Sequence, residues 1–343
     1  MQNLKIENID IGSEYEPLVI PEIGINHNGS LETACKMVDA AVRAGAKIIK
    51  HQTHIIDDEM SCEAKNVIPG NSTKSIYQVM AECALSEEEE KELMEYVQSK
   101  GLVFLSTPFS RASALRLDKF GVSAFKIGSG EMNNYPLIDL ISKFGRPMIV
   151  STGMNDLESV KRTAEIITKN NCPFALLHTT NLYPTPVEFV RLGAMLELKE
   201  FGVPFGLSDH TLNNNACIAA IALGASIVER HFTDTKDRVG NDIICSMDET
   251  ELKCLIESSK EVYSMLGGKK APLPEEKVTI DFAFATVVTI SDIKEGELFT
   301  SENLWVKRPG TGEIKAVDYE KLIGRRAKAN IKKDTHITWG MVL

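Results

Sequence analysis

Short apolar runs alternate with amphipathic stretches along most of this chain. The runs are rich in β-branched residues and nearly continuous in hydrophobicity, which is typical of parallel strands covered on both faces. Eight runs are expected to be strands, at residues 18–24, 47–53, 102–108, 123–129, 147–153, 174–180, 204–210 and 226–232. Helical patterns follow them near residues 31–44, 87–100, 111–120, 137–144, 157–170, 188–199, 214–223 and 248–266.

Eight strand–helix units in succession predict an α/β fold, a TIM (β/α)8 barrel. Acidic residues crowd the segment 86–90, where a helix N-terminus favours them. An open, doubly wound sheet is the alternative. Against it, the turn after the first strand reads EIGINHNGS (22–30) and lacks the G-x-G-x-x-G pattern of dinucleotide-binding folds.

The pattern changes after the eighth helix. GGKKAPLPEEK (267–277) has glycines, prolines and charges without periodicity, and it predicts a linker. Short alternating runs follow, and DIKEGELFTSENL (292–304) resembles NIKKDTHITWGMV (330–342). This similarity suggests a small pseudo-symmetric β domain, and a chance similarity of turn-rich sequences is the alternative. We place the barrel at 1–267, the linker at 268–280 and the small domain at 281–343.

Charge and composition exclude several partner classes. The net charge is −10 and no Lys/Arg block occurs, so a nucleic-acid partner is not expected. No stretch is apolar and long enough to span a membrane, and the N-terminal MQNLKIENIDIGSEYEP lacks a signal-peptide pattern. The seven cysteines are scattered without a C-x-x-C pair, which indicates reduced thiols in a cytoplasmic protein.

Polar residues stand at the end of every predicted strand. Parallel barrels carry their chemistry at the carboxyl ends of the strands, so these side chains are expected to meet at one face. They are Glu22, Asn26, His27, Lys50, Gln52, His54, Ser106, Thr107, Lys126, Ser129, Glu131, Ser151, Thr152, Thr180, Asn181, Tyr183, Ser208, Asp209, His210, Glu229 and His231. A purely structural sequence has little reason for such a series.

Two of these residues, His210 and His231, end adjacent strands and favour a divalent metal site. Two histidines leave a coordination sphere open to oxygen ligands, which suits Mn²⁺ or Mg²⁺ rather than closed structural zinc. Asp209, Glu229 and Asp242 are candidates for further ligands or for residues that orient the ligands.

Lys126 and its hydroxyl and amide neighbours form a candidate anion site. Glu22 and Glu131 are candidate acid–base groups, and pairing with Lys50 or Lys126 would position them. The connection from His54 to Leu85 is unusually long for a barrel, which favours a lid or binding loop.

Ten segments together carry a resemblance to a known family. They are EIGINHNGS (22–30), KHQTHI (50–55), STPF (106–109), KIGSGE (126–131), STGM (151–154), TTNLYPTP (179–186), GLSDH (206–210), ERHF (229–232), DFAFATVV (281–288) and NLWVKRPGTG (303–312). In these motifs the chain resembles the bacterial sialic acid (N-acetylneuraminate) synthases over essentially its whole length. The last two resemble the family's C-terminal antifreeze-like (SAF) domain, a β-clip.

The resemblance implies a role for each matching residue. His210 and His231 would bind the metal, typically Mn²⁺, with Mg²⁺ or Co²⁺ as substitutes. Glu22 and Glu131 would be catalytic. Phosphoenolpyruvate would contact Lys50, Thr107, Lys126, Ser129, Ser151, Asn181 and Ser208. The sugar would contact Gln52, Asn71, Tyr183, Asp242, Phe282 and Arg308, the last from the SAF domain of the partner in a domain-swapped homodimer.

The implied reaction joins phosphoenolpyruvate, N-acetylmannosamine and water into N-acetylneuraminate and phosphate. KHQTH (50–54) resembles the N-acetylneuraminate branch more than the branches that make legionaminic or pseudaminic acid from 2,4-diacetamido sugars. A hypothesis of another class makes the small domain a glycan- or ice-binding module on a barrel scaffold. The polar residues at eight strand ends argue against it.

Overall fold

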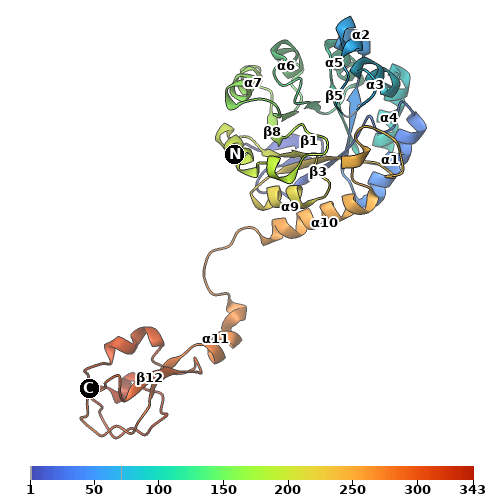
Figure 1. Ribbon diagram of the computed structural model, residues 1–343. Coiled ribbons are helices and arrows are strands. Elements are labelled where there is room, and N and C mark those ends of the chain that lie inside the picture. The colour runs from blue at the N-terminus through green and yellow to red at the C-terminus, as the bar shows by residue number, and fades with distance from the viewer. Residues whose placement is uncertain (1, 71) are drawn as a thin grey trace. The chain divides into compact units, whose positions relative to one another are not determined.

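The computed structural model describes residues 2–70 and 72–343. The chain divides into two compact units, one ending at Leu266 and the other beginning at Gly267. The first unit is the predicted TIM barrel, in which eight parallel strands close in the order β10-β3-β4-β5-β6-β7-β8-β9 inside a ring of helices (Figure 1).

The barrel strands follow the predicted runs closely. They are β3 (Leu18–Gly24), β4 (Ile48–Thr53), β5 (Val103–Pro108), β6 (Phe125–Ile127), β7 (Met148–Ser151), β8 (Phe174–Thr179), β9 (Phe205–Asp209) and β10 (Ile227–His231). The outer helices are α1 (Leu31–Ala44), α4 (Glu87–Ser99), α5 (Arg111–Phe120), α6 (Tyr135–Ser142), α7 (Leu157–Lys169), α8 (Leu192–Glu197), α9 (Asn215–Ala222) and α10 (Glu249–Met265).

Local sequence fixes the ends of several helices. Ser86 begins α4 with a capping box in which its hydroxyl accepts from the Glu89 amide and the Glu89 side chain accepts from the Ser86 amide. Gly121 ends α5 in the left-handed conformation that glycine adopts at little cost.

Two segments differ from the expected pattern. The sixth helix, expected near 188–199, is divided into η2 (Val187–Phe189), α8 and η3 (Leu198–Phe201). The long connection after β4 contains α2 (Ile56–Glu59), η1 (Cys62–Asn66) and α3 (Ile76–Cys83). These elements are too short to give a clear period in the sequence, and tertiary contacts decide them.

An N-terminal hairpin closes the inside of the barrel, and the sequence did not predict it. Its strands, β1 (Leu4–Ile6) and β2 (Ile9–Ile11), are antiparallel. Their buried side chains join one cluster with the inward residues of the barrel strands, Leu18 and Ile48 among them. Strands of three residues bury too little on their own, so their existence depends on this contact.

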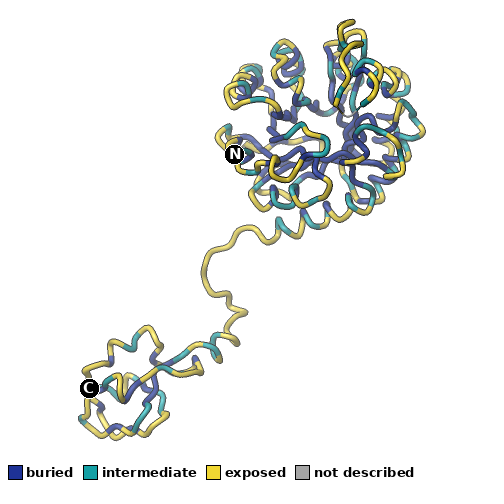
Figure 2. The backbone as a smooth tube through the Cα atoms, viewed as in Figure 1, coloured by how far each residue is buried: buried dark blue, intermediate teal, exposed yellow. Residues whose placement is uncertain are grey.

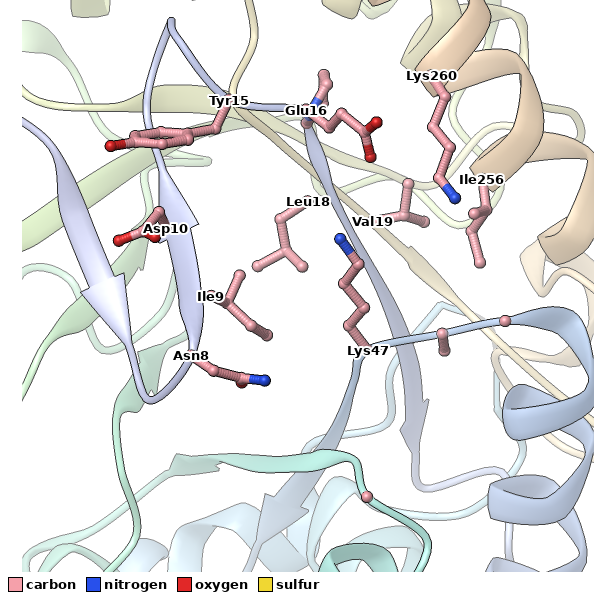
Figure 3. A pocket seen from close by; sticks show the side chains of 14 residues that line it. Asn8, Ile9, Asp10, Tyr15, Glu16, Leu18, Val19, Lys47, Ile256 and Lys260 are labelled. Carbon is pink, nitrogen blue, oxygen red and sulfur yellow. The ribbon is translucent and has the colours of Figure 1, made fainter.

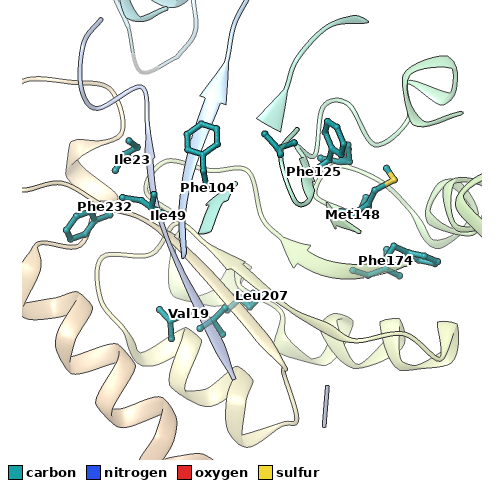
Figure 4. Packing of buried hydrophobic residues seen from close by; sticks show 14 of the residues in the cluster. Val19, Ile23, Ile49, Phe104, Phe125, Met148, Phe174, Leu207 and Phe232 are labelled. Atoms are coloured by element: carbon teal, nitrogen blue, oxygen red, sulfur yellow. The ribbon is translucent and has the colours of Figure 1, made fainter. Parts of the chain in front are cut away.

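The main core lies between the strands and the helices. Its side chains come from the outward faces of the strands, for example Ile49, Phe104 and Phe125 (Figure 4). Ile48 faces the inner cluster and Ile49 the outer one, as the two-residue period of a strand requires. The strands are therefore buried on both sides, and exposed residues gather on the helices (Figure 2).

The second unit has its own core and begins with η5 (Pro274–Glu276) and α11 (Lys277–Ala283). In the second unit, β11 (Thr286–Thr289) and β12 (Leu304–Lys307) pair in antiparallel fashion, and the short helices η6 (Ala316–Lys321) and η7 (Trp339–Met341) follow them. One further short helix, η4 (Ile243–Cys245), belongs to the barrel unit. Ile293 and Ile331, which occupy matching places in the two similar segments, exchange backbone hydrogen bonds of 2.8 Å in both directions. The two similar segments therefore pair with each other at an equivalent position.

Among the described residues, no helix combines the length and apolarity needed to cross a membrane.

Candidate active site

One cavity lies at the carboxyl ends of the barrel strands. Its volume is about 160 Å³, and all eight strands or the loops that follow them contribute side chains. The lining residues are Glu22, Lys50, Gln52, Thr107, Phe109, Lys126, Gly128, Ser129, Gly130, Glu131, Ser151, Thr179, Asn181, Tyr183, Ser208, His210, Glu229 and His231. The expectation that the polar strand ends converge is met for these residues.

Alternation along each strand decides which polar residues enter the cavity. On β4, Lys50 and Gln52 point inward, whereas His51 and Thr53 contact the buried Glu90 of α4. Asp209 of β9 also turns away and accepts from the Thr211 hydroxyl at 2.8 Å. A one-residue step reverses the face of a strand residue, so neighbours in the same motif serve different purposes.

Lys50 lies at the centre of a buried charge network. Its Nζ is 2.8 Å from Oε1 of Glu22 and 2.9 Å from Oε1 of Glu229. Glu229 also accepts from the Ser208 hydroxyl at 3.1 Å, and Lys126 Nζ lies 3.7 Å from it. Burial alone would lower the pKa of Lys50, but the two carboxylates outweigh it and raise the pKa.

Lys126 has less carboxylate charge close to it than Lys50 has, because its nearest carboxylate oxygen, on Glu229, is 3.7 Å away. It donates to the Ser151 hydroxyl at 2.6 Å and to the Ile127 carbonyl at 2.9 Å. Burial, together with the charge of Lys50, lowers its pKa to about 8 despite the attraction of Glu229. An anion that reached Lys126 would restore the missing negative charge, so this lysine is suited to bind one.

Several polar atoms around Lys126 have no protein partner. Within the described residues these are Thr107 Oγ1, Thr179 Oγ1 and Asn181 Oδ1, all buried. Buried polar atoms are normally hydrogen-bonded, and atoms that line a cavity without a partner are suited to bind a polar ligand. Gly153 allows this packing, because a Cβ there would lie 1.8 Å from Asn181 Oδ1.

The two candidate catalytic carboxylates differ in electrostatics. Burial would raise the pKa of Glu22, but Lys50 and His231 outweigh burial and hold the pKa well below its usual range. For Glu131, burial prevails and raises the pKa to about 7, with the Glu59 carboxylate adding to the shift. The pairing considered for Glu22 is therefore present, whereas Glu131 is a carboxyl poised to exchange a proton near neutral pH.

His210 and His231 face each other with ring centroids 5.3 Å apart. His210 donates from Nδ1 to the Thr180 carbonyl at 2.9 Å, which leaves its Nε2 free to accept a hydrogen bond or to coordinate a cation. Nδ1 of His231 is buried without a hydrogen bond, 3.5 Å from Oε2 of Glu22. Burial and the neighbouring His231 lower the pKa of His210 to about 3, which keeps the ring neutral.

This donor set fits a metal with an open coordination sphere. Among the described residues, no group of three or more His, Cys, Asp or Glu side chains is arranged to hold a metal ion. A cation bound by His210 and His231 would take its other ligands from solvent or substrate, as Mn²⁺ and Mg²⁺ do readily and structural zinc does not.

The remaining residues expected at the sugar site are not among those that line this cavity. Asp242 borders it, with Oδ2 3.9 Å from Nδ1 of His231 and a pKa raised by burial. Asn71 lies outside the described residues. Phe282 and Arg308 belong to the second unit, where the Phe282 side chain is exposed.

Sequence reasoning missed two side chains of the cavity, Phe109 and Thr179, which line it without having been selected. Glu229 was expected at a strand end as a metal ligand or as a residue that orients the ligands, and it pairs with the two lysines. The alternating pattern pointed to Thr179, which precedes Asn181 by two residues on the same side. No feature of the sequence indicated that Glu229 would pair with Lys50 and Lys126 rather than bind a metal.

A second cavity opens at the opposite end of the barrel and measures about 430 Å³. It lies between the N-terminal hairpin and the first residues of β3 and β4, with Tyr15, Lys47 and Lys260 at its edge (Figure 3). Among the described residues, none that lines this cavity has an unpartnered buried polar side-chain atom, in contrast to the first cavity. We therefore assign the chemistry to the carboxyl-end cavity.

Comparison with known proteins agrees with this geometry. The NeuB family model matches residues 37–271, and the SAF domain model matches residues 284–343. The N,N'-diacetyllegionaminic acid synthase of Campylobacter jejuni is 36% identical over 92% of this chain and 97% of its own length. The N-acetylneuraminate-9-phosphate synthase of Homo sapiens is 31% identical over 95% of this chain and 93% of its own length.

A solved structure extends the likeness to three dimensions. The N-acetylneuraminic acid synthetase of Leptospira borgpetersenii, in complex with citrate, superposes with a TM-score of 0.75. The two sequences are 28% identical, and the match covers 81% of this chain and 95% of that chain. The chain therefore belongs to the NeuB family of sialic acid synthases and carries a SAF domain after its barrel.

Proposed function

We propose that this protein condenses phosphoenolpyruvate with N-acetylmannosamine and water to give N-acetylneuraminate and phosphate. The observation that carries the proposal is one cavity lined by two buried lysines, two histidines and two glutamates whose pKa values are shifted in opposite directions. Phosphoenolpyruvate needs cations and hydrogen-bond donors, and an aldehyde needs an electrophilic partner for its oxygen.

Phosphoenolpyruvate is proposed to bind beside Lys126. Ser151 contacts this lysine, and Ser129 and Asn181 lie against Gly153 on the same side. Thr107, Lys50 and Ser208 complete the anion site. The charges of Lys50 and Lys126 are balanced by those of Glu22 and Glu229, so the cavity offers a trianion little net positive field.

This charge balance supports a divalent cation at His210 and His231, with Mn²⁺ as our proposal. When bound, the metal would act as a Lewis acid on the aldehyde oxygen of the open-chain sugar. The chain's own contribution is to orient His210 through the Thr180 carbonyl, to keep the His210 ring neutral by burial, and to hold Glu22 beside Nδ1 of His231.

The two carboxylates divide the remaining work. C3 of phosphoenolpyruvate forms the new bond to the aldehyde carbon as the C2=C3 double bond opens and the aldehyde C=O pair moves onto its oxygen, so positive charge develops at C2. Glu22, held ionised by Lys50, can stabilise that charge without taking a proton. Water then adds at C2 and gives one proton to Glu131, which passes it to the former aldehyde oxygen. The C2–O bond to phosphate breaks as the new C2 hydroxyl becomes the carbonyl, and the proton of that hydroxyl leaves with phosphate.

The sugar is proposed to contact Gln52, Tyr183 and Asp242 in the barrel, together with Asn71. Phe282 and Arg308 would be supplied by the SAF domain of the partner in a homodimer. Because phosphoenolpyruvate is a metabolite of the cytoplasm, we propose that the enzyme acts there.

A 2,4-diacetamido sugar is a second candidate substrate. The chain is 36% identical to the C. jejuni legionaminic acid synthase and 31% identical to the human N-acetylneuraminate-9-phosphate synthase. This difference favours a diacetamido sugar as the substrate. The motif KHQTH favours N-acetylmannosamine. Both sugars would use the same fold, metal site and reaction.

A phosphate-release assay decides between them. The enzyme is incubated with Mn²⁺, phosphoenolpyruvate and either N-acetylmannosamine or each 2,4-diacetamido sugar, and products are identified by mass. Turnover confined to N-acetylmannosamine supports the proposal, and preference for a diacetamido sugar moves the enzyme to the legionaminic or pseudaminic branch. Absence of release with every sugar rejects the proposed reaction.

A further inference from the structure

We propose that His54 and Glu59 are positioning residues that fix the orientation of the Gln52 amide, and through it the recognition of the sugar. Neither residue lines the active-site cavity. The inference rests on the proposed function for the identity of the ligand, but the arrangement itself stands on three hydrogen bonds.

These hydrogen bonds form a continuous chain from Glu22 to Glu59. Gln52 Nε2 donates to Oε1 of Glu22 at 2.7 Å, and Gln52 Oε1 lies 3.0 Å from Nε2 of His54. On the other side of the ring, Nδ1 of His54 lies 2.8 Å from Oε2 of Glu59. The side chains of His54 and Glu59 are 1% and 9% exposed, so water competes little for these contacts.

The donors and acceptors leave one consistent assignment. Glu22 Oε1 receives both Lys50 Nζ at 2.8 Å and the Gln52 NH₂ group at 2.7 Å, so this oxygen is an acceptor and the Gln52 nitrogen faces it. The Gln52 oxygen therefore faces His54 and requires a donor at Nε2. With Glu59 as a carboxylate, Nδ1 also donates, so this hydrogen-bond pattern places a proton on each ring nitrogen of His54.

Neighbouring residues hold this ring and the amide in place. Phe109 stacks on His54 with centroids 4.4 Å apart and planes 18° from parallel. Gly24, at φ +45°, lies against the amide, and a Cβ there would be 3.2 Å from Gln52 Nε2. With one N–H on Glu22, the second N–H of Gln52 is left for an oxygen of the ligand.

Glu59 ties this chain to the long loop after β4. It is the last residue of α2, and the same helix is anchored on both sides. Asp57 accepts from the Tyr77 hydroxyl of α3 at 3.1 Å, and Asp58 accepts from the Ala112 amide of α5 at 2.7 Å. The loop thus carries the counter-charge that orients a residue at the centre of the barrel mouth.

Kinetic variants separate this role from general packing. Glu59→Gln removes the charge, His54→Phe removes both hydrogen bonds but keeps a ring to stack on Phe109, and Glu59→Asp keeps the carboxylate. Glu63→Gln, an exposed site on η1, is the matched control. In Glu59→Gln and His54→Phe the Gln52 amide loses its fixed orientation, and loss of its hydrogen bond to the sugar predicts a sugar KM raised about tenfold, with the phosphoenolpyruvate KM within about twofold of wild type. Glu59→Asp should recover part of the loss.

A second measurement needs no substrate. In histidine ¹⁵N-labelled protein, the ring of His54 should show both nitrogens protonated at neutral pH, and in Glu59→Gln one of them should lose its proton. A neutral His54 ring in the wild type overturns the inference, as does an equal rise in KM for both substrates. If wild-type enzyme turns over no sugar, the proposed function fails, and the ¹⁵N spectrum alone decides the arrangement.

Discussion

Lys50 Nζ lies 2.8 Å from Glu22 Oε1 and 2.9 Å from Glu229 Oε1, and all three side chains are at most 5% exposed. One lysine thus compensates two buried carboxylates. Because each carboxylate lost water on folding, the lysine is needed for stability as well as for chemistry.

Lys50→Met should destabilise the barrel. Removing one partner of a buried ion pair costs about 3–5 kcal/mol, since the remaining charges stay buried without compensation. Chemical denaturation monitored by circular dichroism measures the change. Lys47→Met, at the exposed start of the same strand region, is the control and should cost little. Similar losses in both variants would show that Lys50 does not compensate the carboxylates.

The pH profile of kcat/KM should be bell-shaped. As a base, Glu131 must be ionised, so activity should rise as pH passes its pKa of about 7. As an anion-binding cation, Lys126 must be protonated, so activity should fall as pH passes its pKa of about 8. Glu131→Gln should remove the rising limb and lower kcat by about 10²–10⁴-fold.

A control for this profile comes from Glu229, whose charge raises the pKa of Lys126. Glu229→Gln should move the falling limb to lower pH and leave the rising limb in place. A falling limb that does not move would contradict the assignment of that limb to Lys126.

Metal binding should depend on the two facing histidines. We expect titration calorimetry with Mn²⁺ to detect one site per chain in the wild type and none in His210→Ala or His231→Ala, because each variant leaves a single imidazole. His178→Gln is the control, since His178 contacts the Val190 carbonyl at 2.9 Å outside the cavity. Retained Mn²⁺ affinity in His210→Ala would place the metal elsewhere.

Mixed dimers test whether the SAF domain acts on the partner barrel. Arg308→Ala alone should raise the sugar KM about ten- to a hundredfold while sparing phosphoenolpyruvate. Refolding it together with His210→Ala should restore activity, because each heterodimer contains one barrel with intact His210 opposite an intact Arg308. Random pairing in a symmetric dimer predicts recovery to about a quarter of wild type. Proven heterodimers without recovery would favour a site completed within one chain.

Much of the barrel was predictable because its signals are local. The apolar runs and helical periods of the first unit need only neighbouring residues to be recognised, and Ser86 and Gly121 mark helix ends by their own chemistry. The hairpin at Leu4–Ile11 and the short helices after β4 were not predictable, since their stability comes from contacts distant in sequence.

The sequence by itself determined which polar residues end the strands, because strand alternation and the order of the units are written in the chain. Only the tertiary structure decided how these residues combine. Glu229 joins Lys50 across 179 positions, and Glu22 and Glu131 acquire opposite pKa shifts although both are glutamates near the carboxyl end of a strand. The physical reason is that pKa and pairing depend on burial and on charges a few ångströms away, and closure of the barrel sets those distances.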